Sequence, residues 1–411
     1  MFDLAKAVSA STKKEQQDTG PGGCSLFYQS PEVHELIEEI CRFEGWPAPE
    51  CQRESHSRIA VDKLQDLVIL ELNQSNDVVA DARRFASQMP NKSGIVVVGK
   101  ENAITTLREL KAMGFYYLFW PVDKKEFTDF LRHVHSNQKK FSGVSQNRKA
   151  KRISVIGTRG GTGTTLIATE LASALAGSGA ETLLVDHKYL NSNIDIILCR
   201  KDIIKTDVKN IAVQLHELDE DAAFSYLTPI SKRLHLLGLT GNRPQKDLME
   251  FSHSIGDLLL RRTNFIVEDY SASVDFPLDV AVLAKRSDMV VLVLEPSVTS
   301  LRNAQRIMEQ LGKITLPNGA ETRLLTVVNY HRPDGAFSLN LQEMQQFLEA
   351  EIDIVIPFNK QFAHMVLEGR RLHKQESGKQ KPLTALYQLI NGQLAPSRTS
   401  PLSLFKEVFK R

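Results

Sequence analysis

The sequence predicts an α/β protein with two domains, each built on a parallel sheet that carries helices on both faces. The chain has 411 residues, which is more than a single hydrophobic core usually serves. Short runs of Val, Ile and Leu recur along it and alternate with stretches that carry apolar residues at helical spacing. A polar, basic segment separates a shorter first half of this pattern from a longer second half.

Composition limits the classes of function. The chain has 51 Lys and Arg against 49 Asp and Glu, a net charge of +2, so we expect no specific nucleic-acid partner. Its four cysteines include no CxxC pair, so a disulfide framework or a zinc knuckle is not expected and a reducing cytoplasm fits. No apolar run approaches the ~18–20 residues of a membrane span, so membrane attachment would be peripheral.

The first part of the chain is expected to contain a disordered segment and a compact domain. Residues 1–23 are polar and rich in Ser, Thr, Lys and Gly, which is typical of disorder. The first domain covers 24–137, and helical patterns follow its strands, as parallel strands with helical crossovers require. Its predicted strands are Leu26–Tyr28, Leu67–Leu72, Ile95–Val98 and Phe115–Trp120.

The second part begins after a polar, basic stretch, 138–152, which we expect to be a solvated linker. The second domain covers 153–394. Its predicted strands are Ile153–Ile156, Thr182–Val185, Leu234–Leu239, Phe265–Glu268, Met289–Glu295, Leu324–Asn329 and Ile354–Ile356. A tail, 395–411, could form a short amphipathic helix, and two roles stay open for it: contact with a membrane surface, or docking on its own domain.

The stretch Ile153–Leu166, ISVIGTRGGTGTTL, places a glycine-rich turn between an apolar strand and a helix. Glycines let backbone N–H groups approach a polyphosphate, and the start of a helix attracts anions. The standard P-loop, GxxxxGK[ST], needs glycine at position 158 and lysine at position 164, and this chain has threonine at both. The loop is therefore expected to hold a nucleotide and to hydrolyse it poorly. The alternative is that the glycines serve only a tight turn.

Four further residues lie where strands of the second domain end. Asp186, Asp269 and Asn329 each end a predicted strand, and Pro357 follows the last one. In an open α/β sheet, ligands bind beyond the carboxyl ends of the strands. We therefore expect all four residues at the same edge of the sheet as the glycine-rich turn.

This set resembles the MinD/ParA family of ATPases, whose altered P-loop reads xKGGxGK[ST]T, over about 153–394. The resemblance implies a P-loop fold, ATP or ADP with Mg²⁺ as cofactors, and a homodimer formed face to face over the nucleotide. It implies that Arg159 replaces the family's signature lysine, which reaches the other subunit's phosphates, and that Asn329 reads the adenine. The nucleotide-binding set carried over is Arg159, Gly160, Gly161, Thr162, Gly163, Thr164, Thr165, Asn329 and Pro357. The metal-binding set is Thr165, Asp186 and Asp269.

Two departures from the family pattern concern catalysis. Thr164 replaces the P-loop lysine, and Lys188 replaces a carboxylate that orients the attacking water in the family. Phosphoryl transfer depends on positioned charge, and loss of one such group commonly costs ~10²–10³ in rate. We therefore predict no catalytic residue and very slow hydrolysis or none.

The first domain resembles the receiver domain of response regulators, which has a flavodoxin-like fold. The run Asp66–Asn73, DLVILELN, resembles the receiver's third strand, with Glu71 at the phosphoacceptor position. Gln29 and Ser30 stand in place of the acidic pair that holds Mg²⁺, and Trp120 replaces the lysine before the receiver's last proline. Without those groups the chemistry of phosphorylation is missing. The domain is expected to act as a phosphate-independent binding or dimerisation module.

A pseudo-receiver followed by a MinD/ParA-like domain without the P-loop lysine resembles the TadZ/CpaE family of Flp (tight-adherence) pilus assembly proteins. That resemblance implies a factor in the bacterial cytoplasm, at the cell pole and near the inner membrane. It implies that ATP stabilises a dimer and that the dimer recruits the pilus secretion ATPase and other assembly components. The alternative is a ParA/MinD-type active ATPase that partitions or positions DNA or another cargo.

Overall fold

The computed structural model describes residues 20–53, 64–65, 67–89, 93–140, 149–203, 205–209, 218–271, 278–314, 322–376 and 381–391. The chain divides into two compact units, Met1–Arg148 and Lys149–Arg411. The tail expected over 395–411 lies outside the described residues, as do residues 1–19 of the expected disordered segment and 141–148 of the expected linker. Each unit is described by itself.

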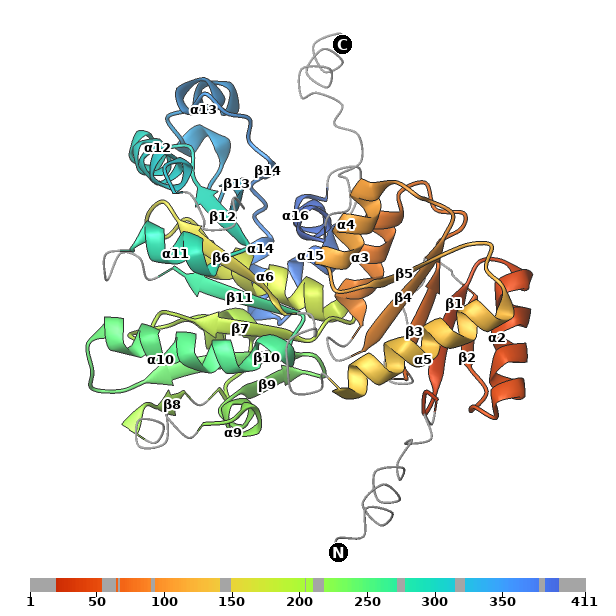
Figure 1. Cartoon of the computed structure of the whole chain (residues 1–411). Helices are drawn as coiled ribbons and strands as arrows, with labels where there is room; N and C mark the ends of the chain where they lie inside the picture. Colours follow the sequence, from red (N-terminus) through yellow and green to blue (C-terminus); the bar gives the residue numbers. More distant parts are fainter. Residues whose placement is uncertain are drawn as a thin grey trace, which may run out of the picture. The chain divides into compact units, whose positions relative to one another are not determined.

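The first unit is a flavodoxin-like α/β domain, as predicted. Its described strands form a parallel sheet in the order β2-β1-β3-β4-β5 (Figure 1). The elements are β1 (Cys24–Tyr28), α2 (Pro31–Glu44), β2 (Glu50–Arg53), β3 (Leu67–Glu71), α3 (Val78–Gln88), β4 (Gly94–Gly99), α4 (Ile104–Ala112), β5 (Tyr116–Phe119) and α5 (Lys124–Lys140). Helices α2 and α5 share one hydrophobic cluster with the sheet, and α3 and α4 share another, so both faces are covered.

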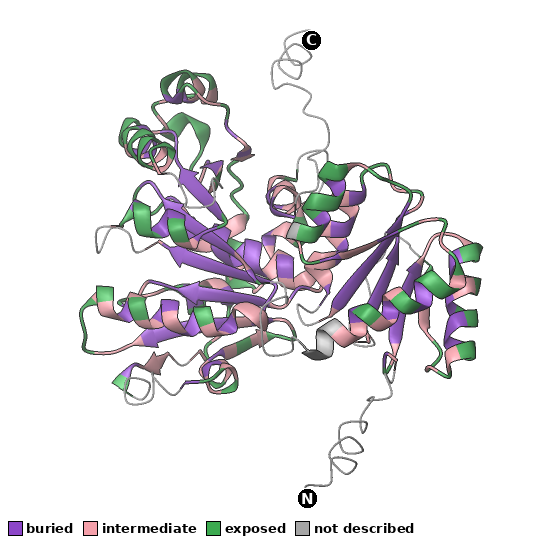
Figure 2. Ribbon diagram, in the orientation of Figure 1, coloured by how far each residue is buried: buried purple, intermediate pink, exposed green. Residues whose placement is uncertain are grey.

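Hydrophobic spacing explains why these segments form their elements. Helix α2 buries Val33, Ile37 and Ile40 along one face and ends at Gly45, whose φ is 70°. Strands β3 and β4 are buried along their whole length (Figure 2). The four strands predicted for this domain are confirmed. Strand β2 was missed because its sequence, ECQR, is polar and half-exposed at the edge of the sheet.

Glu71, at the end of β3, is fully buried and ties β3 to the turn that follows β1. Its carboxylate accepts hydrogen bonds from the backbone N–H groups of Gln29 (2.8 Å) and Ser30 (3.0 Å). The Ser30 hydroxyl (2.5 Å) and the Asn73 amide (2.7 Å) donate to its other oxygen. The carboxylate therefore clamps the position where a receiver would carry its phosphoacceptor. Four donors satisfy the buried charge, as burial of a charge requires.

The hydrogen bonds of Glu71 predict that replacing this residue lowers the stability of the first unit alone. Glu71→Gln places an amide NH₂ group among donors, so it should lower the free energy of unfolding of this unit by about 2–3 kcal/mol. The chain's two tryptophans, Trp46 and Trp120, both lie in the first unit. Urea unfolding followed by tryptophan fluorescence therefore measures this unit selectively. Glu35→Gln, on the exposed side of α2, is the control; equal midpoints for the two variants would show that Glu71 is not a clamp.

The second unit is a P-loop-type α/β domain on a larger sheet, also as predicted. Among the described residues the strand order is β14-β13-β12-β6-β11-β7-β10-β8, and β9 pairs with β10. All pairs are parallel except β9 with β10 (Figure 1). The strands are β6 (Lys151–Gly157), β7 (Thr182–Asp186), β8 (Thr206–Asp207), β9 (Thr228–Ser231), β10 (Leu234–Thr240), β11 (Phe265–Tyr270), β12 (Met289–Leu294), β13 (Arg323–Asn329) and β14 (Ile354–Ile356).

Helices cover both faces of this sheet. On one face, α6, α7, α15 and α16 pack with the strands, and on the other face α9 to α13 do so, in two clusters. The helices are α6 (Thr164–Gly177), α7 (Ile194–Leu198), α9 (Glu220–Ser225), α10 (Gln245–Leu258), α11 (Val280–Arg286), α12 (Val298–Gly312), α13 (Leu341–Leu348), α14 (Phe362–Leu367), α15 (Leu372–Gln375) and α16 (Pro382–Ile390), with 3₁₀ turns at Leu259–Arg261 and Asp334–Ala336. Central strands such as β12 are buried throughout because both of their faces are covered (Figure 2).

The seven strands predicted for the second domain are confirmed, each within two residues of its observed bounds. Strands β8 and β9 were missed, since they are short and half-exposed. Helix α5 extends to Lys140 and β6 begins at Lys151, so both ends of the stretch expected as a linker are regular structure. Arg152, assigned to that stretch, is buried in an ion pair with Glu268 (3.0 Å). No described helix is long and apolar enough to cross a bilayer.

Candidate functional site

The glycine-rich turn joins β6 to α6 at the carboxyl edge of the second sheet. Gly161 and Gly163 have φ values of 86° and 89°, in the left-handed region that favours glycine. At Gly157 a Cβ atom would lie 2.4 Å from the Thr164 hydroxyl. The glycines are therefore required by the backbone path and by close packing. Gly160 and Gly161 are exposed, which leaves this part of the loop accessible.

The loop threonines point inward and hold the loop to itself. Thr162 and Thr164 are buried, and their hydroxyls lie 3.0 Å apart. The Thr162 hydroxyl also donates to the carbonyl of Arg159 (3.2 Å). Position 164, which carries the lysine of a standard P-loop, thus supplies an internal hydrogen bond and no cation.

Position 158, where a standard P-loop has its first glycine, ties the loop to the neighbouring helix α12. Thr158 is buried, and its hydroxyl lies 2.7 Å from that of Ser300. Asn303 donates from its side-chain amide to the Thr158 carbonyl (2.9 Å). A threonine is therefore accommodated at this position by polar partners from the first turns of α12.

Asn329 reaches the loop from the end of β13. Its side-chain amide donates to the Thr162 carbonyl (2.8 Å), and a Cβ atom at Gly163 would lie 2.4 Å from that amide nitrogen. The structure therefore brings Asn329 to the loop, and its role in reading adenine stays a prediction. Pro357 is exposed and directly follows Ile356, the residue that pairs with Asn329.

The three residues predicted to bind metal come together beside the loop. Asp186 and Asp269 are in register on the neighbouring strands β7 and β11, and both are buried. The Thr165 hydroxyl lies near enough to Asp269 to lower the pKa of that carboxyl, and Ser271 donates to the same carboxylate from its backbone N–H (3.0 Å) and its hydroxyl (3.2 Å). Burial and the charge of Asp186 raise the pKa of Asp269 to about 7. Two carboxylates and a hydroxyl are hard oxygen donors of the kind that Mg²⁺ takes, so the residues present fit that ion.

Lys205 brings a cation to this cluster, and sequence reasoning missed it. Its ammonium lies 2.9 Å from Asp186 Oδ2 and 2.8 Å from the carbonyl of Lys188. Lys188 itself donates its backbone N–H to Asp186 Oδ1 (2.9 Å), and Ser192 donates its hydroxyl to Oδ2 (2.6 Å). Lys205 precedes the two-residue strand β8, a position that carries no recognisable pattern. Its stem fits because residue 238 on β10 is glycine, where a Cβ atom would lie 3.3 Å from Lys205 Cγ.

Arg159, the residue that replaces the family's signature lysine, is paired within its own chain. One guanidinium nitrogen lies 2.6 Å from Glu295 Oε1, and the Arg159 side chain stays 45% exposed. Glu295 directly follows β12 and also accepts from the Ser297 hydroxyl (2.9 Å), with His331 Nε2 at 3.4 Å. Glu295 was also missed. A signal for it existed, since it is an acidic residue at a strand end on the same edge as Asp186 and Asp269.

A buried polar network packs against β11 on the face of the sheet opposite to the Asp269 side chain. Glu268 accepts from Arg152 (3.0 Å), from the Ser154 hydroxyl (3.2 Å) and from the Tyr270 hydroxyl (3.2 Å). The ring of His187 stacks on Tyr270 with centroids 4.2 Å apart. Successive side chains of a strand point to opposite faces, so Glu268 lies on one face of β11 and Asp269 on the other. The network around Glu268 therefore anchors the strand that carries Asp269.

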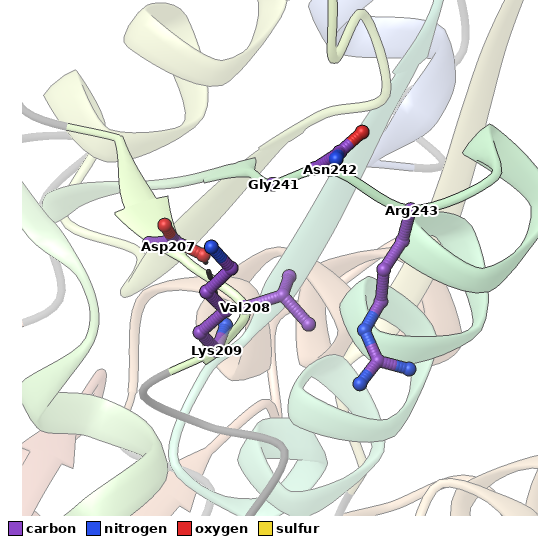
Figure 3. A pocket seen from close by; sticks show the side chains of 6 residues that line it. All are labelled: Asp207, Val208, Lys209, Gly241, Asn242 and Arg243. Carbon is purple, nitrogen blue, oxygen red and sulfur yellow. Dashed lines mark hydrogen bonds between the residues drawn. The ribbon is translucent and has the colours of Figure 1, made fainter.

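A separate pocket opens at the ends of β8 and β10, with a volume of about 280 Å³. Figure 3 shows Lys209 and Arg243 on either side of it, with Asp207 accepting a hydrogen bond from the Lys209 backbone (2.9 Å). Its lining is Asp207, Val208, Lys209, Gly241, Asn242 and Arg243. None of these residues belongs to the glycine-rich loop, so the pocket is distinct from the cluster around Asp186 and Asp269.

A family model and several solved structures are similar to the second unit. The CbiA family, described as the CobQ/CobB/MinD/ParA nucleotide binding domain, matches residues 153–372. Similar solved structures include a ParA family ATPase from Chlorobium tepidum (19% identity, 58% of this chain and 96% of that chain, TM-score 0.47). They also include MinD from Pyrococcus furiosus (21% identity, 59% and 99%, TM-score 0.44) and the MinC:MinD complex of Aquifex aeolicus (19% identity, 61% and 98%, TM-score 0.47). No curated protein sequence matches the chain.

The loop geometry predicts that Gly163 cannot be replaced. Gly163→Ala adds a Cβ atom against the Asn329 amide and forces a left-handed backbone that costs about 1–2 kcal/mol by itself, so the second unit should lose at least that much stability. Gly177→Ala, at the other end of α6, meets no atom within 4 Å and should leave stability equal or slightly higher. Urea unfolding followed by circular dichroism, with the tryptophan signal of the first unit as internal reference, measures both. Equal losses in the two variants would contradict this account of the loop.

The Lys205–Asp186 ion pair predicts a second effect. Lys205→Met leaves the buried Asp186 carboxylate without its cation, which should cost about 3 kcal/mol. Millimolar Mg²⁺ should recover more of the thermal midpoint in this variant than it adds to the wild type, because the metal becomes the main counter-charge. Lys201→Met, at an exposed position four residues earlier, is the matched control. An unchanged midpoint in Lys205→Met would show that the pair contributes nothing.

Proposed function

The chain belongs to the CobQ/CobB/MinD/ParA nucleotide-binding family, and from that premise we propose that its second unit binds ATP with Mg²⁺ to stabilise a homodimer. One observation carries the proposal. Thr165, Asp186 and Asp269 gather beside an accessible glycine-rich loop, while positions 164 and 188, which serve hydrolysis in the family, hold threonine and lysine. The chain keeps groups that hold a nucleotide and lacks groups that cleave it.

Each proposed contact rests on a specific residue. The backbone N–H groups of 160–165 and the guanidinium of Arg159 would hold phosphate oxygens. Thr165, Asp186 and Asp269 would hold Mg²⁺, which supplies positive charge between the phosphates. Asn329 and Pro357, at the adjoining strand ends, would lie near the adenine. To reach the nucleotide or a partner subunit, Arg159 must leave Glu295, and its exposed side chain is free to do so.

The lack of a hydrolytic group gives the nucleotide a structural role. The Thr164 side chain is turned into the loop and bonded to Thr162, and the side chain at 188 carries no carboxylate. Phosphoryl transfer without these charges is expected to be slower by a factor on the order of 10²–10³ or more. A ligand that binds the dimer and not the monomer shifts the equilibrium by mass action, so ATP can hold two subunits together without turnover.

At the cellular level the proposal is a polar localisation factor for the Flp pilus, of the TadZ/CpaE kind. The dimer would recruit the pilus secretion ATPase and other assembly components near the inner membrane. What supports this is the pairing of a flavodoxin-like unit with a family domain that lacks the P-loop lysine. The Glu71 clamp fills the position at which a receiver is phosphorylated, so the first unit is proposed to bind partners independently of phosphate. The tail, 395–411, is proposed to offer peripheral membrane contact.

Sedimentation and turnover test the proposal together. The full chain should sediment as a larger species with Mg-ATP than without nucleotide, and phosphate release should be barely above background. Arg159→Ala should weaken the ATP-dependent dimer, whereas Arg306→Ala, at an exposed site on α12, should not. Absence of ATP binding in calorimetry at millimolar concentration would refute the proposal. Rapid phosphate release would favour the alternative, a ParA/MinD-type active ATPase.

A further inference from the structure

Three metal-ligating side chains meet on the first unit, outside the nucleotide site. His34 and Glu38 lie on α2, and Cys51 lies on β2. His34 Nε2 is 3.5 Å from Glu38 Oε1. One ligand atom of each of the three residues lies within 4.8 Å of the others. A nitrogen, an oxygen and a sulfur donor therefore converge at one point.

The fold brings these donors together although the sequence spacing contains no metal-binding motif. His34 and Glu38 are one helical turn apart, so they share a face of α2. Strand β2 pairs in parallel with β1, with Cys51 opposite Leu26, which places it beside that face. The Cys51 thiol has a weak contact with the Pro49 carbonyl (3.6 Å), so its sulfur is available to a stronger partner.

Local packing and charge favour a cation at this point. The Tyr28 ring lies against the His34 imidazole, with centroids 4.6 Å apart and an interplanar angle of 30°, which restricts the orientation of the imidazole. Helix α2 also carries five glutamates. Glu39 and Glu44 are ion-paired with Lys124 and Arg132. The exposed Glu32, Glu35 and Glu38 add negative charge on the same helix, which attracts cations.

The distances suit a small tetrahedral ion. Zinc bonds to nitrogen and oxygen at about 2.0–2.2 Å, and a tetrahedral angle then separates those two ligands by about 3.4 Å. The observed separation of 3.5 Å between His34 Nε2 and Glu38 Oε1 matches this. The Cys51 sulfur lies within 4.8 Å of both atoms, and it must move closer to take a zinc–sulfur bond of about 2.3 Å. Mixed imidazole, carboxylate and thiolate ligands suit zinc better than magnesium or calcium.

We propose that His34, Glu38 and Cys51 form a binding site for a divalent cation of the zinc type, with water as the fourth ligand on the exposed side. On binding, the Cys51 S–H bond breaks, its proton passes to solvent, and a metal–sulfur bond forms without any change of oxidation state. The ion would link the edge strand β2 to α2.

The other cluster of similar composition is different in kind. His187, His253 and Glu268 are all buried in the second unit. There the Glu268 carboxylate already holds the Arg152 guanidinium at 3.0 Å, with His187 Nε2 at 3.9 Å. The charge of that cluster is balanced without a metal.

Cobalt(II) as a probe tests the proposal on the full chain. After metal is removed with a chelator, one equivalent of Co²⁺ should produce the near-ultraviolet absorption of a cobalt–thiolate bond, and one equivalent of Zn²⁺ should abolish it. Cys51→Ser should remove this band. His34→Ala should weaken Co²⁺ binding by more than about tenfold, since loss of even an outer partner of a ligand costs 10–100-fold. Cys199→Ser, at the exposed cysteine of the second unit, should change neither property.

The test separates this site from the proposed magnesium site. Cobalt bound by Thr165, Asp186 and Asp269 would have oxygen ligands and no thiolate band, and Asp186→Ala would remove it. A thiolate band that survives Cys51→Ser or disappears in Cys199→Ser would overturn the proposal, as would the absence of any thiolate band. Failure here would leave the proposed nucleotide function untouched, because no residue is shared between the sites.

Discussion

The second unit depends on the register of parallel strands around β6. Because β7, β11, β6 and β12 run in the same direction, their carboxyl ends meet at one edge of the sheet. Asp186 and Asp269 are directly paired there, and the glycine-rich loop leaves β6 beside them. Burial first, and the nearby charge of Asp186 second, raise the pKa of Asp269. Positive charge is therefore favourable at this edge of the sheet.

Two basic side chains of the chain itself lie near this edge of the sheet. Lys205 approaches Asp186 from the start of β8, and Arg159 balances Glu295 on the other side of the loop. The hydroxyls of Thr162 and Thr164 contact each other within the loop, and the Thr158 hydroxyl ties the loop to Ser300 of α12. The loop is consequently held by the protein before any ligand arrives. A loop that is already ordered would lower the cost of binding the proposed nucleotide.

In the first unit, the buried Glu71 carboxylate has a comparable structural role. The Glu71 carboxylate holds the turn after β1 to the end of β3. In both units, side-chain hydrogen bonds hold a backbone segment that follows a strand.

The sequence by itself determined the elements whose pattern is local. Fully buried strands read as continuous runs of Val, Ile and Leu, so β3, β4, β7 and β12 were predictable. The glycine loop and the acids at strand ends were predictable because their positions follow from strand direction.

Tertiary structure decided everything that depends on which segments meet. The polar edge strand β2 is defined by its pairing with β1, and Arg152 looked like a linker residue until Glu268 and the packed sheet gave it a buried partner. Lys205 and Asp186 are 19 residues apart, and only the placement of β8 beside β10 joins them. His34, Glu38 and Cys51 likewise meet because a helix face and a strand come side by side. The physical reason is common to all of these cases: a polar side chain carries no periodic signal, and its role is set by the partner that the fold places against it.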